Sequence, residues 1–98
     1  MNSSNFDVLI NELKKNGHSD DKVMTVRATL AATYRISSKQ VADILGTLSF
    51  DSTKLEVAKM AYPYAIDKGN YAATVGAALT FSSGKNELSE FIQNCMYY

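Results

Sequence analysis

Apolar residues recur along this chain at helical intervals, and the same intervals return further along the sequence. In the segment that begins near Ser19, the apolar steps from Val23 are three, four and four residues. The segment that begins near Asp51 repeats these steps from Leu55. Steps of three and four residues place side chains on one face of an α-helix, and the alternation typical of a strand is absent. The sequence therefore predicts an all-α fold.

A second apolar pattern alternates with the first and repeats at a similar distance. Its steps are three, one and three residues from Val41, and they return from Ala72. The flanks agree as well, since residues 48–50 (Leu-Ser-Phe) match residues 79–81 (Leu-Thr-Phe). A repeat of about 31 residues is typical of stacked helical hairpins, in which each pair buries its face against its neighbours. We predict stacked antiparallel hairpins with this repeat, and the alternative is a globular six-helix bundle.

Capping and breaking residues divide the chain into about six short helices. Gly17 ends the first helix, and Ser37 opens the third with Gln40 at the capping-box position. Pro63 falls inside the fourth pattern, where proline removes a backbone donor, so we expect a kink or an early end near Tyr62. The expected apolar faces span residues 6–13, 23–34, 41–48, 55–66, 72–79 and 88–95.

Two phenylalanines and two aspartates stand at the expected helix starts. Phe50 and Phe81 occupy equivalent places between consecutive helix pairs, so we predict that each is a buried wedge. Losing one would then cost about 3–5 kcal/mol. Asp51 and Asp67 are expected to act as N-caps that stabilise the helices they open.

The charge balance limits the kinds of partner, and the short apolar stretches limit the expected place of the protein in the cell. Ten Lys and Arg residues balance ten Asp and Glu residues, so the formal net charge is zero. Nucleic-acid affinity is mostly driven by cationic side chains, so we expect no nucleic-acid partner. The apolar stretches are much shorter than a membrane span, and the N-terminal sequence lacks the features of a signal peptide. We expect one cytoplasmic domain over residues 1–98 without a membrane span.

The residues that carry catalysis or bind metals are nearly missing. A single cysteine, Cys95, excludes an internal disulfide, and a single histidine, His18, excludes a site with several His ligands. None of the common nucleotide-binding, metalloprotease or hydrolase motifs occurs. The acidic segments lack the alternating ligands, central Gly and terminal Glu of an EF-hand loop. We therefore predict no catalytic residue, no metal site, no cofactor and no enzyme activity.

Tyrosine is the one informative excess, with six tyrosines and no tryptophan. Tyrosine is favoured at interfaces because its ring buries area while its hydroxyl stays in water. Tyr64 and Tyr71 flank the irregular junction at Pro63, where they form either an exposed binding patch or the packing of the junction. Tyr97 and Tyr98 end an apolar C-terminal segment, which either packs on the first helix or joins a second copy in a homodimer.

Three short motifs in the chain form a distinctive combination: an F-D-x-x-K-L start, an A-Y-x-x-x-x-D-x-x-N-Y run and a Q-V-x-x-I-L helix. They are carried by Phe50, Asp51, Lys54, Leu55, Ala61, Tyr62, Asp67, Asn70, Tyr71, Gln40, Val41, Ile44 and Leu45. With these motifs the chain resembles a small, uncharacterised all-helical domain of unknown function found in bacteria, especially Bacteroidetes, and in some eukaryotes. The resemblance implies a compact helical domain. Because that family has no assigned activity, it implies no catalytic residues.

These observations favour a non-enzymatic domain that presents a groove or an aromatic edge to a protein or peptide partner. The alternative function is a helical pocket for a small molecule or lipid. That pocket would need the small residues of the fifth helix to leave space beside Val75 and Phe81. These small residues are Ala72, Ala73, Gly76, Ala77 and Ala78.

Overall fold

The protein is all-helical, as the apolar periodicity predicts. The computed structural model describes residues 1–15, 17–33 and 35–95. Apart from one isolated β-bridge, these residues contain helices and loops only. The helices are α1 (Ser3–Lys15), α2 (Ser19–Thr33), α3 (Ser38–Leu45), α4 (Asp51–Ala61), the 3-10 helix η1 (Tyr62–Tyr64), α5 (Lys68–Gly76) and α6 (Ser82–Cys95).

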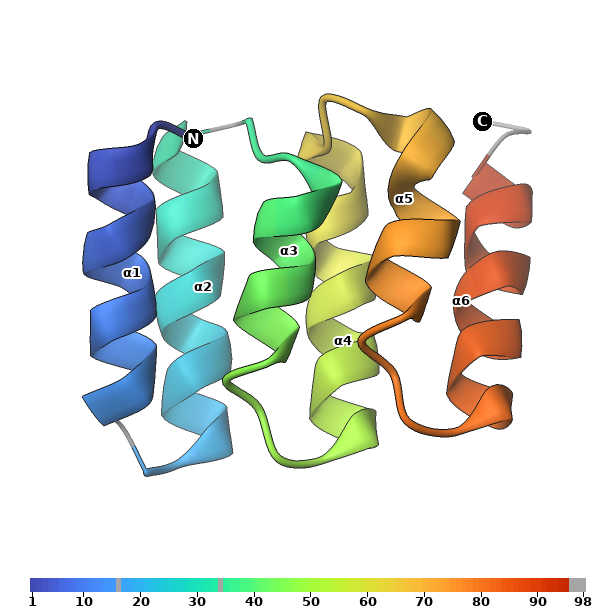
Figure 1. Ribbon diagram of the computed structural model, residues 1–98, viewed down its shortest axis with the longest axis horizontal. Helices are drawn as coiled ribbons and strands as arrows, with labels where there is room; N and C mark the ends of the chain where they lie inside the picture. The colour runs from blue at the N-terminus through green and yellow to red at the C-terminus, as the bar shows by residue number, and fades with distance from the viewer. Residues whose placement is uncertain (16, 34, 96–98) are drawn as a thin grey trace.

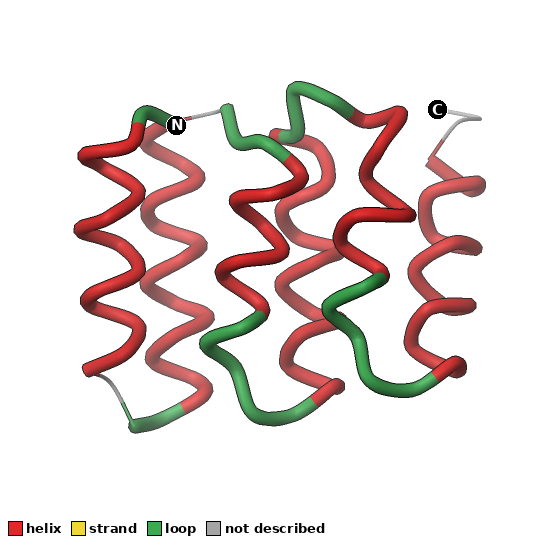
Figure 2. Tube along the Cα trace, viewed as in Figure 1, coloured by secondary structure: helices red, strands yellow, loops and turns green. Residues whose placement is uncertain are grey.

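Consecutive helices stand side by side as antiparallel hairpins in two layers (Figure 1). In one layer α3 packs between α1 and α5, and in the other α4 packs between α2 and α6. The loops alternate between two edges of the molecule (Figure 2). We call residues 35–37 and 62–67 the upper edge, and residues 46–50 and 77–81 the lower edge. The arrangement agrees with stacked hairpins, while the length of the sequence repeat stays a prediction.

The core lies between the two layers and follows most of the expected faces. The four apolar residues predicted for the third helix are buried, and so are Val75 and Leu79 after α5 begins. The expectation for Ala72 is wrong, because its side chain is exposed and the preceding Tyr71 points inward instead. Adjacent positions on a helix lie only about 100° apart, so a wide apolar face can include either one.

Pro63 ends the fourth helix early, as predicted. The α-helix stops at Ala61, and the short η1 helix with Pro63 in its first turn follows. Ile66 lies beyond this break and is 60% exposed. Its expected place on the buried face of the fourth helix is therefore wrong, because the periodicity of a helix no longer applies after the proline.

Hydrogen bonds join the loops of successive hairpins along the upper edge. The Ile36 N–H donates to the Tyr64 carbonyl at 3.0 Å, and the Ile66 N–H donates to the Ile36 carbonyl at 2.9 Å. These two bonds form a parallel β-bridge between Ile36 and Ala65. They satisfy backbone groups that would otherwise be partly buried without a partner.

Two lysines at equivalent positions form hydrogen bonds with backbone carbonyls at the lower edge. Lys22 Nζ of α2 donates to the Thr47 carbonyl at 2.7 Å, and Lys54 Nζ of α4 donates to the Ala78 carbonyl at 3.2 Å. The two bonds span similar stretches of chain, 25 residues from Lys22 and 24 residues from Lys54. Each ammonium group contacts the C-terminal end of a helix in the other layer, where the helix dipole favours a cation.

The predicted capping is confirmed at Ser37 and corrected at the two aspartates. Ser37 and Gln40 form the capping box of α3. Asp51 and Asp67 make no side-chain cap on α4 and α5. Each carboxylate accepts hydrogen bonds from the start of another helix instead: Asp67 from Ser38 N–H at 2.8 Å, and Asp51 from Phe81 N–H at 2.9 Å. Stacking brings these unpaired helix-start N–H groups within reach, so the aspartates join hairpins rather than end their own helices.

Candidate functional site

Tyr71 lies in the core, so an exposed patch of Tyr64 and Tyr71 is ruled out. The Tyr71 side chain is 0% exposed, and its hydroxyl donates to the Ala58 carbonyl at 2.6 Å. Its ring meets the ring of Tyr62 edge-on, with centroids 5.0 Å apart. Burial raises the pKa of Tyr71 well above its usual value. The alternative reading, packing around an irregular helix junction, is the correct one for Tyr71.

The other predicted site residues divide into one at the upper edge and two that are not placed. Tyr64 is half-buried against the core, and its backbone carbonyl belongs to the β-bridge described above. Tyr97 and Tyr98 lie outside the described residues. Of the four tyrosines, the structure therefore places Tyr64 and Tyr71, and self-association through the C-terminal segment stays a prediction.

Phe50 and Phe81 are surface residues, which corrects their predicted role as buried wedges. Each ring is 63% exposed. Leu48 and Leu79, two residues earlier, occupy the buried places at the end of each hairpin. Phe50 is extended and begins α4, and Phe81 directly precedes α6, so the chain turns each ring away from the core. Apolar periodicity does not report such a turn at a helix start.

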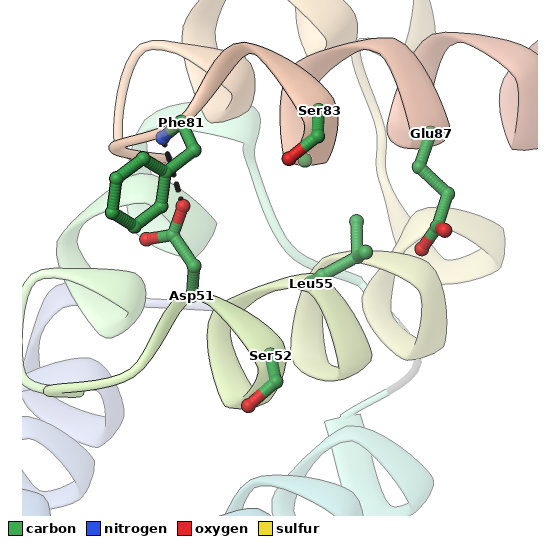
Figure 3. A pocket seen from close by; sticks show the side chains of 7 residues that line it. Asp51, Ser52, Leu55, Phe81, Ser83 and Glu87 are labelled. Atoms are coloured by element: carbon green, nitrogen blue, oxygen red, sulfur yellow. Dashed lines mark hydrogen bonds between the residues drawn. The ribbon is translucent and has the colours of Figure 1, made fainter.

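A hollow of about 190 Å³ lies beside Phe81, between the first turns of α4 and α6 (Figure 3). Asp51 and Leu55 enter it from α4, and Ser83 and Glu87 face them from α6. It is lined by Asp51, Ser52, Leu55, Phe81, Ser83, Gly84 and Glu87. The hollow therefore combines an exposed aromatic ring, an aliphatic side chain and two carboxylates.

Backbone hydrogen bonds fix the position of Asp51 in this hollow. Its carboxylate accepts from the N–H of Thr80 at 3.0 Å and from that of Phe81 at 2.9 Å. The Phe81 N–H holds the pKa of Asp51 below its usual value, so the carboxyl stays ionised. The same bond fixes the backbone that carries the exposed Phe81 ring.

A second, larger hollow of about 400 Å³ lies between α1 and α3. It is lined by Phe6, Asp7, Ile10, Lys14, Ala42, Asp43, Gly46 and Thr47. Neither hollow is lined by the small residues between positions 72 and 78, of which Ala72, Ala73 and Ala77 are exposed. Close packing buries Val75 completely, so these two hollows give no support to a pocket beside it.

The described residues offer neither a metal site nor a membrane span. Within them, no group of three or more His, Cys, Asp and Glu side chains is placed to hold a metal ion. None of the described helices has the length and apolar character needed to cross a membrane. Cys95, at the end of α6, is half-buried and reduced.

The fold and these hollows define an all-α domain of stacked helical hairpins with an aromatic lower edge. The chain matches the family described as Domain of unknown function (DUF4476) over residues 1–92, and it belongs to that family. A comparison with curated proteins gave no match, and neither did a comparison with solved structures. The resemblance to a helical domain of unknown function is therefore confirmed.

Proposed function

We propose that this domain is a non-enzymatic module that binds a protein or peptide partner at its lower edge. The observation that carries the proposal is the pair of exposed rings, Phe50 and Phe81. They begin equivalent helices of consecutive hairpins and are equally exposed. Exposure of a large aromatic side chain to water is unfavourable, and such side chains supply much of the binding energy of many interfaces.

The lower edge is held in place before any partner arrives. Lys54 joins α4 to the Ala78 carbonyl, and Asp51 binds the N–H groups of Thr80 and Phe81. A surface that is already ordered loses little conformational freedom on binding, so more of its contact energy appears as affinity. This rigidity supports a docking surface rather than a loop that folds on its partner.

The two acidic side chains of the hollow beside Phe81 already have partners, which supports the non-enzymatic part of the proposal. Asp51 accepts two backbone hydrogen bonds, and Glu87 pairs with Lys59 Nζ at 3.2 Å. A general base needs a free lone pair directed at a substrate proton and a pKa near the working pH. The lowered pKa of Asp51 moves that carboxyl away from such a role.

Selection from a displayed library of random peptides tests the proposal. Peptides bound by the wild-type domain are expected to bind Phe50→Ala and Phe81→Ala at least several-fold more weakly, because each variant removes a ring from the contact. Val8→Ala is the matched control, since Val8 of α1 is 64% exposed but lies away from the lower edge. Peptides that bind the double variant Phe50→Ala/Phe81→Ala as tightly as the wild type contradict the proposal.

The hollow between α1 and α3 supports a second candidate, the binding of a small apolar molecule or lipid. Its volume of about 400 Å³ lies within the range of roughly 300–1,000 Å³ usual for small-molecule pockets. Titration with dodecanoate tests it, with Ala42→Leu as the variant that fills the hollow. Saturable binding that Ala42→Leu removes supports this function, and an absence of binding to the wild type ends it.

Self-association and location complete the proposal. A homodimer through Tyr97 and Tyr98 is tested by light scattering on the full chain and on a chain that ends at residue 96. A dimer that becomes a monomer supports it, and a monomer in both cases rejects it.

A cytoplasmic location is tested by imaging the tagged protein in its own cell.

A further inference from the structure

The hollow beside Phe81 is too small for a whole ligand and large enough for one side chain. Its volume of about 190 Å³ lies below the roughly 300 Å³ at which pockets for small molecules begin. It equals the space of about six water molecules, at roughly 30 Å³ each. A partner on the lower edge would therefore place one side chain in it while the rest of the partner stays outside.

The charges at the hollow favour a basic side chain. Its two ionisable lining residues are Asp51 and Glu87, and no basic residue is among those that line it. Two lysines of α4 lie near these carboxylates: Lys59 Nζ pairs with Glu87 at 3.2 Å, and the charge of Lys54, whose Nζ donates to the Ala78 carbonyl, contributes to the lowered pKa of Asp51. Because Asp51 stays ionised, the hollow keeps at least one negative charge at neutral pH.

The apolar walls suit the other parts of such a side chain. The exposed Phe81 ring offers its face to a cation, which the negative charge density of an aromatic face attracts. Leu55 provides an aliphatic contact for a methylene stem, in the way that long basic side chains lie along apolar surfaces. Ser83 adds a hydroxyl oxygen that accepts hydrogen bonds, whereas the Ser52 hydroxyl points away from α6 (Figure 3).

Gly84 helps to keep the hollow open. A Cβ atom at this position would lie 3.7 Å from Asp51 Oδ2 and 3.8 Å from Leu79 Cδ1, which is ordinary contact. The corresponding position at the start of α4 is Thr53. A Cβ at position 84 therefore meets ordinary contacts, and a side chain built on it would take up part of the space.

We propose that the hollow formed by Asp51, Leu55, Phe81 and Glu87 receives an arginine or lysine side chain of a partner protein. This inference rests on the proposed function, because it names the chemistry of the partner at the same lower edge. An arginine guanidinium would stack on Phe81 and donate hydrogen bonds to Glu87 and to the Ser83 hydroxyl. The matching ring, Phe50, would contact a neighbouring part of the partner.

The peptides selected on the wild-type domain test this inference. We expect them to share one Arg or Lys, and we expect replacement of that Arg by the uncharged isostere citrulline to weaken binding about five- to tenfold. Glu87→Gln is expected to weaken binding of the arginine peptide but not of the citrulline peptide. Lys59→Gln is expected to strengthen it, because Glu87 loses its competing cation.

A second variant separates the hollow from the stability of the fold. Gly84→Thr is expected to keep the thermal midpoint of the domain and to weaken binding of the arginine peptide at least threefold. Peptides that need Phe50 and Phe81 but share no basic residue, or that bind equally with citrulline, overturn the inference and leave the proposed function standing. A library that yields no peptide dependent on the two phenylalanines overturns both.

Discussion

The two edges of the molecule use their aromatic residues in opposite ways. Next to the upper edge, Tyr71 in the first turn of α5 is fully buried and Tyr62 nearly so, and their rings contact each other. At the lower edge Phe50 and Phe81 are mostly exposed, although phenylalanine is the more apolar residue. The difference teaches that position within the hairpin decides burial here. Tyr71 lies within α5 and reaches Ala58 of α4 in the other layer, whereas each phenylalanine directly precedes a helix.

The hydroxyl of Tyr71 is tolerated in the core because it has a hydrogen-bond partner there. Tyr71 donates to the Ala58 carbonyl of α4, 13 residues earlier. A buried tyrosine hydroxyl without a partner would cost free energy, but this one joins α5 to α4. The exposed rings of the lower edge have no comparable role in the core among the described contacts, which is why we assign them to binding.

Tyr71→Ala is expected to give the largest effect on stability. Removing the ring leaves a cavity beside Ala58 of α4 and Tyr62 of η1, so the free energy of unfolding should fall by about 3–5 kcal/mol. Denaturant unfolding followed by circular dichroism measures it. Tyr64→Ala serves as the control, because Tyr64 is only half-buried and its loss should cost clearly less. Equal losses for both would erase the distinction between core and edge.

Tyr71→Phe is expected to have a smaller effect of about 1 kcal/mol. This change keeps the ring and removes only the hydroxyl, which leaves the Ala58 carbonyl without its buried donor. The same unfolding measurement on Tyr62→Phe provides a comparison at the next ring. An unchanged stability for Tyr71→Phe would show that the bond to Ala58 contributes nothing.

The two aspartates predict a dependence of stability on acid pH at both edges. Backbone N–H groups lower the pKa of Asp67 at Ser38 and of Asp51 at Phe81. A carboxyl whose folded pKa lies below its unfolded value stabilises the protein above that unfolded value, near 3.8. This stability is lost as the pH falls through the folded pKa. Unfolding curves between roughly pH 2 and 6 should show the loss.

Single variants assign this dependence to an edge. In Asp67→Ala the free energy of unfolding should change less with acid pH, because the carboxylate at the upper edge is gone. In Asp51→Ala it should also change less, because the carboxylate that binds the lower edge is gone. Asp43→Ala is the control, because Asp43 forms only a surface pair with Lys39 at 3.6 Å. An acid limb that neither variant changes would show that the bonds between hairpins do not depend on these charges.

Much of the fold could be predicted from the sequence because helical periodicity is a local signal. It indicated the buried face of α3, and Pro63 indicated the end of α4. It could not separate Tyr71 from Ala72, since both fit one wide face. It also could not find the partners of Asp51 and Asp67, because these lie 29 to 30 residues away and depend on stacking.

The candidate site was harder to predict for the same reason. The tyrosines stood out by number, but burial of Tyr71 depends on a carbonyl of another helix. The exposed phenylalanines looked like core residues because they occupy equivalent places between consecutive helix pairs in the sequence repeat, although their neighbours are mostly polar. A useful signal was present: each phenylalanine follows a buried leucine by two residues and directly precedes a helix start.

The substitution with the smallest expected effect on stability most directly tests the central claim, which is that Phe50 and Phe81 are surface residues. The free energy of unfolding should be measured for the double variant Phe50→Ala/Phe81→Ala beside the wild type. Since both rings are surface residues, the account predicts a change within about 1 kcal/mol and an unchanged helical spectrum. A loss of several kcal/mol, as buried wedges would give, would return both rings to the core and contradict the lower edge as a binding surface.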